Sequence, residues 1–196
     1  MEQRNWKSLF KDELERISAP HEWDFILDNT LQKQLAWLVY IPCTFGRFHC
    51  SSCNRLWHSA RVHLLFLMML DKVRRCGTVK MRIFKQKCRR CTSADMEEPE
   101  ISQENIRIVI GNLVNRIQSK IYLKNNWNQD RKPLVIDNFI EGPHNKEHCE
   151  ACQANVCPIS MLNMDRSIPG NSIGLYLILP AVFFIICFII HFITNI

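Results

Sequence analysis

The sequence predicts an α+β fold, in which an antiparallel sheet with flanking helices is followed by one C-terminal transmembrane helix. Two apolar repeats with helical spacing, in 6–17 and 106–121, predict the flanking helices. A long apolar segment with period two, 57–70, predicts the central strand of the sheet. A continuous apolar run, 173–193, has the length that a membrane span needs.

The N-terminal segment is typical of an amphipathic helix. Its apolar residues recur at helical spacing, with charged residues between them, and the helix is expected to end near Pro20. These apolar residues are Trp6, Leu9, Phe10, Leu14 and Ile17. We expect this apolar side to cover the sheet.

The next segments lead into the central strand. Residues 23–27 alternate like a strand, and Asp28-Asn29 suits a turn. Residues 31–40 are apolar and fit either a helix or a strand.

The central strand is predicted at 57–70. Both of its faces carry apolar side chains, as in a strand that is covered on both sides. His58 and His63 interrupt this pattern and are interpreted as structural residues. Residues 79–84 also alternate and are expected to return as a hairpin partner, with Gly77 marking the turn.

A second helix follows an acidic, turn-rich patch at 95–100. Apolar residues recur at spacings of three and four from Ile106 to Ile121, and Ser102 is the expected N-cap. Residues 134–140 are a candidate last strand before Gly142.

Ten cysteines in a chain that begins without a secretory signal indicate metal binding in a reducing compartment. Three Cys-x-x-Cys pairs carry this prediction, because a zinc site needs four ligands and each pair supplies two. The predicted hairpin brings Cys50 and Cys53 to the same end of the sheet as Cys88 and Cys91. We therefore expect one zinc site of four thiolates at this end of the sheet, which is the arrangement of a zinc ribbon.

The third pair predicts a second zinc ion. The expected ligands are His144, Cys149, Cys152 and Cys157, and neighbouring His148 is the alternative nitrogen ligand to His144. Both sites are expected to be closed, without the open position of a catalytic zinc. No Walker loop, G-x-S-x-G or H-E-x-x-H motif is present, so the sequence favours a protein that is not an enzyme.

The apolar run 173–193 divides the chain into three predicted parts. They are a cytosolic three-CxxC zinc domain at 1–158, a short juxtamembrane linker at 159–172 and the transmembrane helix at 173–193. With no signal before the domain, we expect a tail-anchored protein whose N-terminal domain stays in the cytosol.

A basic stretch runs through the predicted hairpin without an acidic residue. It contains Lys72, Arg74, Arg75, Lys80, Arg82, Lys85, Lys87, Arg89 and Arg90. This stretch fits a phosphate-binding surface, a face that meets anionic lipid or acidic loops, or a solvated strand face that the acidic patch at 95–100 balances.

Taken together, these motifs resemble the receptor-transporting protein family. The resemblance lies in Phe45-Gly-Arg-Phe-x-Cys-Ser-Ser-Cys, Trp57-x-Ser-Ala, Gly77-Thr-Val-Lys-Met-Arg-Ile-Phe, Gln86-Lys-Cys-x-x-Cys, Pro99-Glu, Glu141-Gly-Pro-His and Cys149-Glu-Ala-Cys-x-x-x-x-Cys157. It covers nearly the whole chain, although the segment between Cys157 and the span is shorter than in some family members.

The resemblance implies an escort that accompanies G-protein-coupled receptors, such as odorant or taste receptors, to the cell surface. It would be a single-pass membrane protein of the endoplasmic reticulum, the secretory pathway and the plasma membrane. The alternative is a zinc-dependent RNA-binding protein with an interferon-related antiviral role at membranes. Self-association of the chain is left open.

Overall fold

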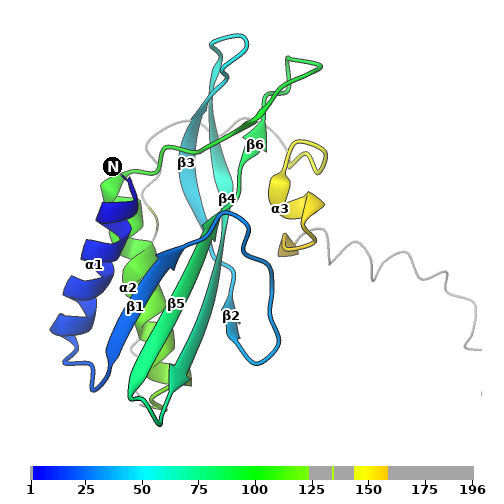
Figure 1. The fold of residues 1–196 in the computed structure, drawn as a ribbon. Helices are drawn as coiled ribbons and strands as arrows, with labels where there is room; N and C mark the ends of the chain where they lie inside the picture. The colour runs from blue at the N-terminus through cyan, green and yellow to red at the C-terminus, as the bar shows by residue number, and fades with distance from the viewer. Residues whose placement is uncertain (1, 124–133, 135–143, 159–196) are drawn as a thin grey trace, which may run out of the picture. The chain divides into compact units, whose positions relative to one another are not determined.

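The computed structural model describes residues 2–123, 134 and 144–158 of the 196-residue chain, and residues 1–157 form one compact unit. Ten elements follow one another in this described part, and Figure 1 shows their arrangement. They are α1 (Glu2–Arg16), β1 (Glu22–Leu27), β2 (Leu38–Tyr40), β3 (Cys43–His49), β4 (Leu56–Asp71), β5 (Cys76–Ile83), β6 (Gln86–Lys87), β7 (Met96–Glu97), α2 (Gln103–Lys120) and α3 (Glu150–Gln153).

The long strand β4 organises the main sheet, as the sequence predicts. The strand order is β1-β5-β4-β2, and β3 also pairs with β4. One half of β4 pairs with β3, from Leu56 to His63, and the other half with β5, from Leu64 to Asp71. The short strands β6 and β7 form a separate ladder, which leads the chain from β5 toward α2.

The sheet is mixed rather than purely antiparallel, which corrects the expected pairing of the first strand. β1 runs parallel to β5, with Phe25 opposite Val79. A parallel neighbour needs a long connection, and the segments between β1 and β5 supply one. Apolar and polar residues alternate in the same way in parallel and antiparallel strands, so the sequence pattern does not indicate the direction of β1 relative to β5.

Gly77 does not mark the hairpin turn, which is a second correction. The turn occupies residues 72–75, and Gly77 lies inside β5, opposite Leu70 on one side and Trp23 on the other. A Cβ atom at this glycine would lie 2.3 Å from Cδ2 of Trp23. Gly77 is therefore needed for close packing against the indole ring rather than for a turn conformation.

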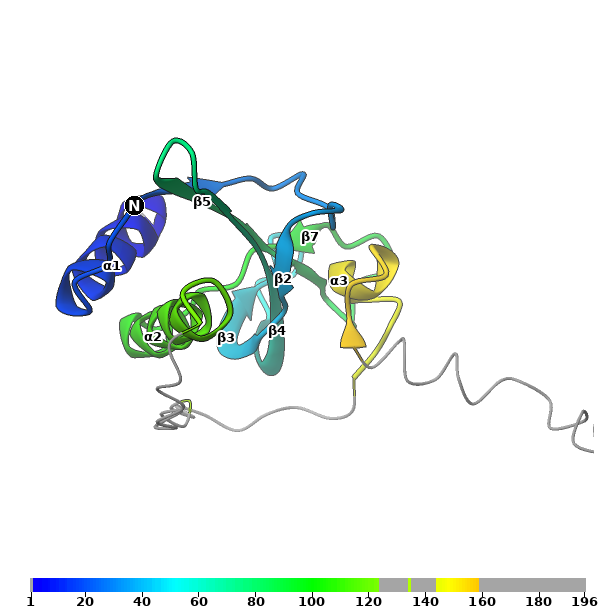
Figure 2. The ribbon, with the colours of Figure 1, turned by 90° about the horizontal axis from the view of Figure 1, so that it is seen from below.

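Both predicted helices form and cover one face of the sheet (Figure 2). α1 packs on α2 and on β1, and its residues Trp6 and Phe10 are fully buried with Phe66 of β4 in one core. The N-cap prediction for α2 is confirmed, because Ser102 Oγ accepts a hydrogen bond from the backbone amide of Asn105.

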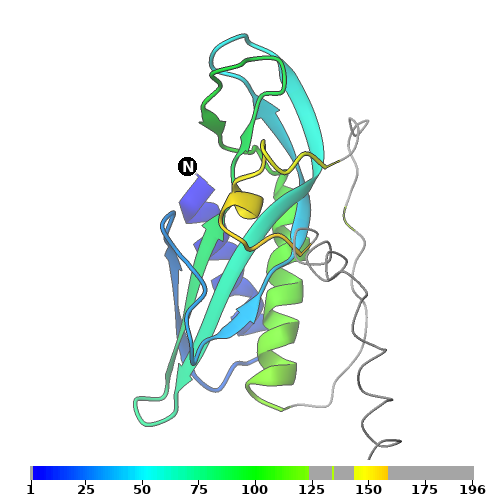
Figure 3. The same ribbon diagram turned by 90° about the vertical axis from the view of Figure 1, so that its right-hand side faces the viewer.

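The opposite face of the sheet is also covered. Leu65 and Leu67 of β4 have no exposed surface, and the loop before β2 lies over this face. Its Leu31 carbonyl accepts a hydrogen bond of 3.0 Å from Arg82, and its Trp37 ring lies 5.1 Å from the Lys80 ammonium. Figure 3 shows α3 on this side of β4, with α2 on the other. The prediction of a strand that is covered on both sides is confirmed.

Three predicted segments lie outside the described residues: most of the candidate strand 134–140, the linker 159–172 and the span 173–193. In the part of the chain that the structure does describe, no helix has the length and apolar character to cross a membrane. The predicted domain boundaries therefore stay predictions.

Candidate metal centres

The first cysteine pair lies in the tight turn between β3 and β4. The Cys50 amide donates a hydrogen bond of 2.9 Å to the Arg55 carbonyl, and the Asn54 amide donates one of 3.0 Å to the Cys50 carbonyl. Asn54 reverses the chain with a positive φ of 56°, a conformation that asparagine tolerates. Cys88 and Cys91 follow β6, and Figure 1 shows both loops at the same end of the unit.

The four sulfur atoms of these pairs fit a tetrahedral zinc ion. They all lie within 4.8 Å of one another, and the Cys50–Cys91 and Cys53–Cys88 sulfur distances are both 3.8 Å. Zn–S bonds of about 2.3 Å at tetrahedral angles place two sulfurs about 3.8 Å apart. The structure thus assembles the grouping that the sequence predicts, and the role of these thiolates as zinc ligands stays a prediction.

The acidic patch holds these loops in place. Glu97 accepts two hydrogen bonds of 2.7 Å through Oε1, one from the amide and one from the hydroxyl of Ser51. The backbones of Arg47 and Glu100 exchange hydrogen bonds of 2.9 and 2.7 Å, and their side chains form an ion pair. Glu97 and Glu100 thus connect the β3–β4 hairpin to the segment that follows Cys88 and Cys91.

The thiols of the first group differ in acidity. Burial opposes ionisation of Cys88, but the backbone amides of Arg90 and Cys91 and the neighbouring thiols donate to its sulfur and lower its pKa to about 7. Hydrogen bonding to Cys53, together with burial, raises the pKa of Cys91 to about 12. Zinc binds cysteine as the thiolate, so metal binding must release the protons that these thiols carry.

The second candidate centre consists of two overlapping groups that share His144. One group contains His144, Cys149 and Cys152, and the other contains His144, Cys157 and His63. His144 Nε2 lies 3.0 Å from the Cys152 sulfur and 3.6 Å from the Cys157 sulfur. A tetrahedral zinc ion places such nitrogen and sulfur ligands about 3.6 Å apart. The four predicted ligands are thus brought together, whereas the substitute ligand His148 belongs to neither group.

The short helix α3 positions the third cysteine pair against the end of β5. Cys149 is its N-cap residue, and the amide and carbonyl of Lys85 exchange hydrogen bonds with the side chain and amide of Glu150. The other carboxylate oxygen of Glu150 lies 2.7 Å from Nη2 of Arg82, in an ion pair that is mostly shielded from solvent. Glu150 therefore connects the second centre to the sheet.

His63 is the residue near this centre that sequence reasoning missed. It lies on the face of β4 opposite the helices, where Nε2 is 3.2 Å from the Cys157 sulfur and Nδ1 is 3.1 Å from the Cys43 sulfur. A buried histidine in an apolar strand was the available signal, but its partner is distant in the chain. The structural interpretation of His63 therefore omitted its contact with a candidate ligand.

Burial shifts the pKa values of His63 and Cys43 in opposite directions. It lowers the pKa of His63 to about 4, with His144 and Arg61 adding to the effect, and it raises the pKa of Cys43 to about 11. The imidazole is thus neutral and Cys43 is a thiol at neutral pH. In the tautomer with hydrogen on Nε2, His63 donates to the Cys157 sulfur and accepts from the Cys43 thiol at Nδ1. This contact would orient Cys157, a predicted ligand, through the next shell of residues.

Replacement of His63 by alanine is expected to weaken the second centre and spare the first. Loss of a residue that orients a metal ligand typically lowers metal affinity by about 10- to 100-fold. Competition between the zinc-loaded protein and a chelator measures this, with one ion expected to leave at lower chelator concentration than in the unchanged protein. H21A, at a histidine that stacks on Tyr122 outside both groups, is the control. Equal retention of both ions by H63A and H21A would rule out the proposed contact.

Similarity to known proteins identifies the domain that carries these centres. A family model described as a zinc-binding domain matches residues 43–155. The chain is 34% identical over 155 residues to receptor-transporting protein 2 of Mus musculus, which covers 77% of this chain and 69% of that protein. It is 32% identical over 155 residues to receptor-transporting protein 4 of Homo sapiens, and this match covers 78% of this chain and 63% of that protein. The chain belongs to the receptor-transporting protein family.

The match to other members of the receptor-transporting protein family covers less of their length. It spans 33% of receptor-transporting protein 3 and 58% of receptor-transporting protein 1, both of Mus musculus. No solved structure matches the chain.

Several members of the basic stretch are paired with neighbouring side chains. Arg82 is paired with Glu150, and the Lys85 ammonium lies 2.9 Å from a Glu98 carboxylate oxygen. Lys80 lies over the ring of Trp37. The central members of the stretch therefore stabilise the domain, and Lys85 pairs with the acidic patch, as the balanced-charge interpretation predicts.

Proposed function

We propose that this chain is a tail-anchored, zinc-binding escort that promotes the folding, trafficking and surface expression of G-protein-coupled receptors, such as odorant or taste receptors. The observation that carries the proposal is identity of about one third to receptor-transporting proteins over most of the chain. The group of four cysteines supports it, because a metal site with four protein ligands stabilises a fold rather than activating water.

In this proposal the span 173–193 anchors the protein, with the N-terminal domain in the cytosol. The protein would work in the endoplasmic reticulum, the secretory pathway and the plasma membrane, where it meets newly made receptors. The anchor confines the domain to the membrane surface and so raises its effective concentration near cytoplasmic receptor loops. Self-association of the chain is compatible with this role.

Surface expression of a receptor panel, with and without the chain, tests the proposal. Truncation after Arg166 is expected to abolish delivery, because the domain loses its anchor. An unrelated membrane span in place of 173–193 is the matched control, and it is expected to restore delivery if the span acts only as a tether. Undiminished delivery by the truncated chain contradicts the escort proposal.

RNA binding is the weaker candidate function. It needs a continuous basic surface along the strands, but Arg82 and Lys85 are engaged with carboxylates. This alternative would be favoured if charge reversal outside the basic stretch leaves RNA binding intact and the chain has no effect on the surface expression of receptors.

A further inference from the structure

A groove of about 440 Å³ lies between the end of α1 and the start of β1. Figure 1 shows α1 beside β1, at the edge of the sheet farthest from β2. Leu14 and Glu15 line the groove from the helix, and Glu22, Trp23 and Asp24 line it from the strand. The groove therefore borders the outer edge of the main sheet.

The backbone on this edge of β1 has no neighbouring strand among the described residues. β1 is the last strand of the order β1-β5-β4-β2, and the Asp28 amide that follows it donates to the Met81 carbonyl of β5 at 2.8 Å. Backbone groups of successive strand residues point to opposite sides, so those of Trp23, Phe25 and Leu27 point to the free edge. No hydrogen bond joins these groups to another described residue.

The two faces of β1 differ in character. On one face α1 packs through buried side chains, with the ring centroids of Phe10 and Phe25 5.1 Å apart and Leu14 in the same core. The other face carries Glu22 and Asp24, whose side chains are exposed. A strand added at this edge would thus meet apolar side chains on the α1 side and carboxylates on the other.

We propose that this edge binds an extended segment of a partner protein, in which basic and apolar residues alternate and which adds to the sheet as a further strand. Strand addition uses backbone hydrogen bonds for affinity and alternate side chains for specificity. Neighbouring side chains lie on the same face of a sheet, so the basic residues would lie beside Glu22 and Asp24, and the apolar residues on the side of Leu14 and Trp23. Among the described residues no cation forms an ion pair with Glu22 or Asp24, so both carboxylates are available to such a segment.

A second copy of this chain is a poorer occupant of the edge. Antiparallel pairing of two β1 strands about Asp24 would place the two Asp24 side chains opposite each other, and pairing about Trp23 would place Glu22 opposite Asp24. Like charges directly opposite each other destabilise a strand pair. The acidic side chains of this edge thus disfavour pairing between copies and favour a basic partner.

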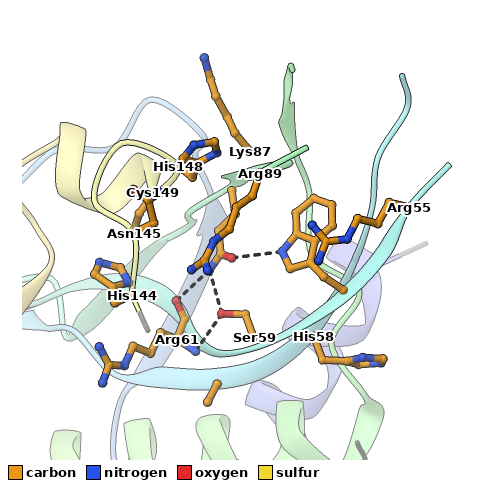
Figure 4. A pocket seen from close by; sticks show the side chains of 13 residues that line it. Arg55, His58, Ser59, Arg61, Lys87, Arg89, His144, Asn145, His148 and Cys149 are labelled. Carbon is orange, nitrogen blue, oxygen red and sulfur yellow. Dashed lines mark hydrogen bonds between the residues drawn. The ribbon is translucent and has the colours of Figure 1, made fainter. Parts of the chain in front are cut away.

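The basic pocket beside the second metal centre presents no comparable set of groups (Figure 4). It measures about 210 Å³, and its lining includes Arg55, Arg61, Lys87 and Arg89. The Gln86 side chain lies at its floor and donates to the Ser59 hydroxyl at 3.0 Å. Figure 4 shows the head groups of Arg61 and Lys87 directed away from this floor, so these two cations do not converge on one ligand.

Binding of a fluorescent peptide to the full zinc-loaded chain in detergent tests the proposal. The peptide has a core in which three lysines alternate with three valines, and fluorescence anisotropy measures its affinity. A control peptide of the same composition has the three lysines first and the three valines after them. It is expected to bind about tenfold more weakly, because only the alternating order places the lysines on one face of a strand.

Methylation of the peptide amides tests the backbone hydrogen bonds separately from the charges. In antiparallel addition the valine amides face β1, and in parallel addition the lysine amides do. One peptide is methylated at its valine amides and a second at its lysine amides. At least one of them is expected to bind about tenfold more weakly than the unmethylated peptide.

Charge reversal on β1 tests the carboxylates. Glu22→Lys with Asp24→Lys is expected to lower the affinity for the alternating peptide by about tenfold or more, since repulsion replaces attraction at both positions. Asp12→Lys with Glu104→Lys makes the same charge change at exposed positions of α1 and α2 outside the groove, and it is expected to leave the affinity nearly unchanged. Zinc content and the unfolding temperature verify that both variants fold, and Glu22→Gln with Asp24→Gln replaces the first variant if it does not.

Several results would overturn the proposal. They are no measurable binding of the alternating peptide, equal affinity for the two orders of lysine and valine, full affinity of both methylated peptides, and an equal loss in the two charge variants. Self-association of the chain that Glu22→Gln with Asp24→Gln strengthens would assign the edge to a second copy instead. The proposal does not rest on the escort function, and failure of one leaves the other standing.

Discussion

Replacement of Cys88 by serine is expected to remove one zinc ion and to unfold the end of the domain that the first metal group holds. The Cys88 sulfur is fully buried and lies 3.8 Å from Cys53 in the four-thiol group. Structural zinc sites contribute an apparent binding free energy of about 10 to 16 kcal/mol, which is as large as the whole stability of a typical domain. Metal analysis and the unfolding temperature of the purified chain measure the effect.

Cys76 provides the matched control for this experiment. It is a half-buried cysteine at the start of β5 and belongs to neither metal group. C76S is therefore expected to retain both ions and to unfold near the temperature of the unchanged protein. If C88S keeps two ions and unfolds at the temperature of C76S, the first group does not hold zinc.

Replacement of Glu150 by alanine is expected to lower the free energy of unfolding by about 3 kcal/mol, in the range for breaking a buried ion pair. The Arg82 side chain is only 12% exposed, so its charge would lose its partner in a poorly solvated place. The Lys85 amide would lose its acceptor as well. The unfolding temperature is expected to fall by about 6 to 12 °C, and thermal denaturation followed by circular dichroism measures it.

Glu15 supplies the comparison for this change. It pairs with Lys11 at 3.7 Å on the surface of α1, where both side chains are well exposed. E15A is expected to change the free energy of unfolding by less than about 1 kcal/mol, because exposed ion pairs contribute little. Equal effects of E150A and E15A would show that Glu150 does not support the attachment of α3.

The helices and the central hairpin were predictable because their signals are local. Apolar residues at helical spacing identified α1 and α2, and period two identified β4. The grouping of Cys50 and Cys53 with Cys88 and Cys91 followed from the same hairpin, since each pair comes at a strand end. Local patterning and strand pairing were therefore sufficient for the first metal group.

Packing between distant segments decided the remaining features. The parallel pairing of β1, the position of Gly77 against Trp23 and the ion pair of Arg82 with Glu150 depend on which elements meet across the sheet. No local pattern carries that information, because side chains that alternate along a strand do not specify the partner that covers them.

His63 and Cys157 show the difference most clearly. They are 94 residues apart in the chain, yet their side chains meet at 3.2 Å. The spacing of the third cysteine pair indicated a second metal centre from the sequence alone. The contact with His63 and the basic pocket beside this centre arise only when residues 144–157 fold back on the face of β4 opposite the helices. Contacts between distant segments form through packing and not through local preference.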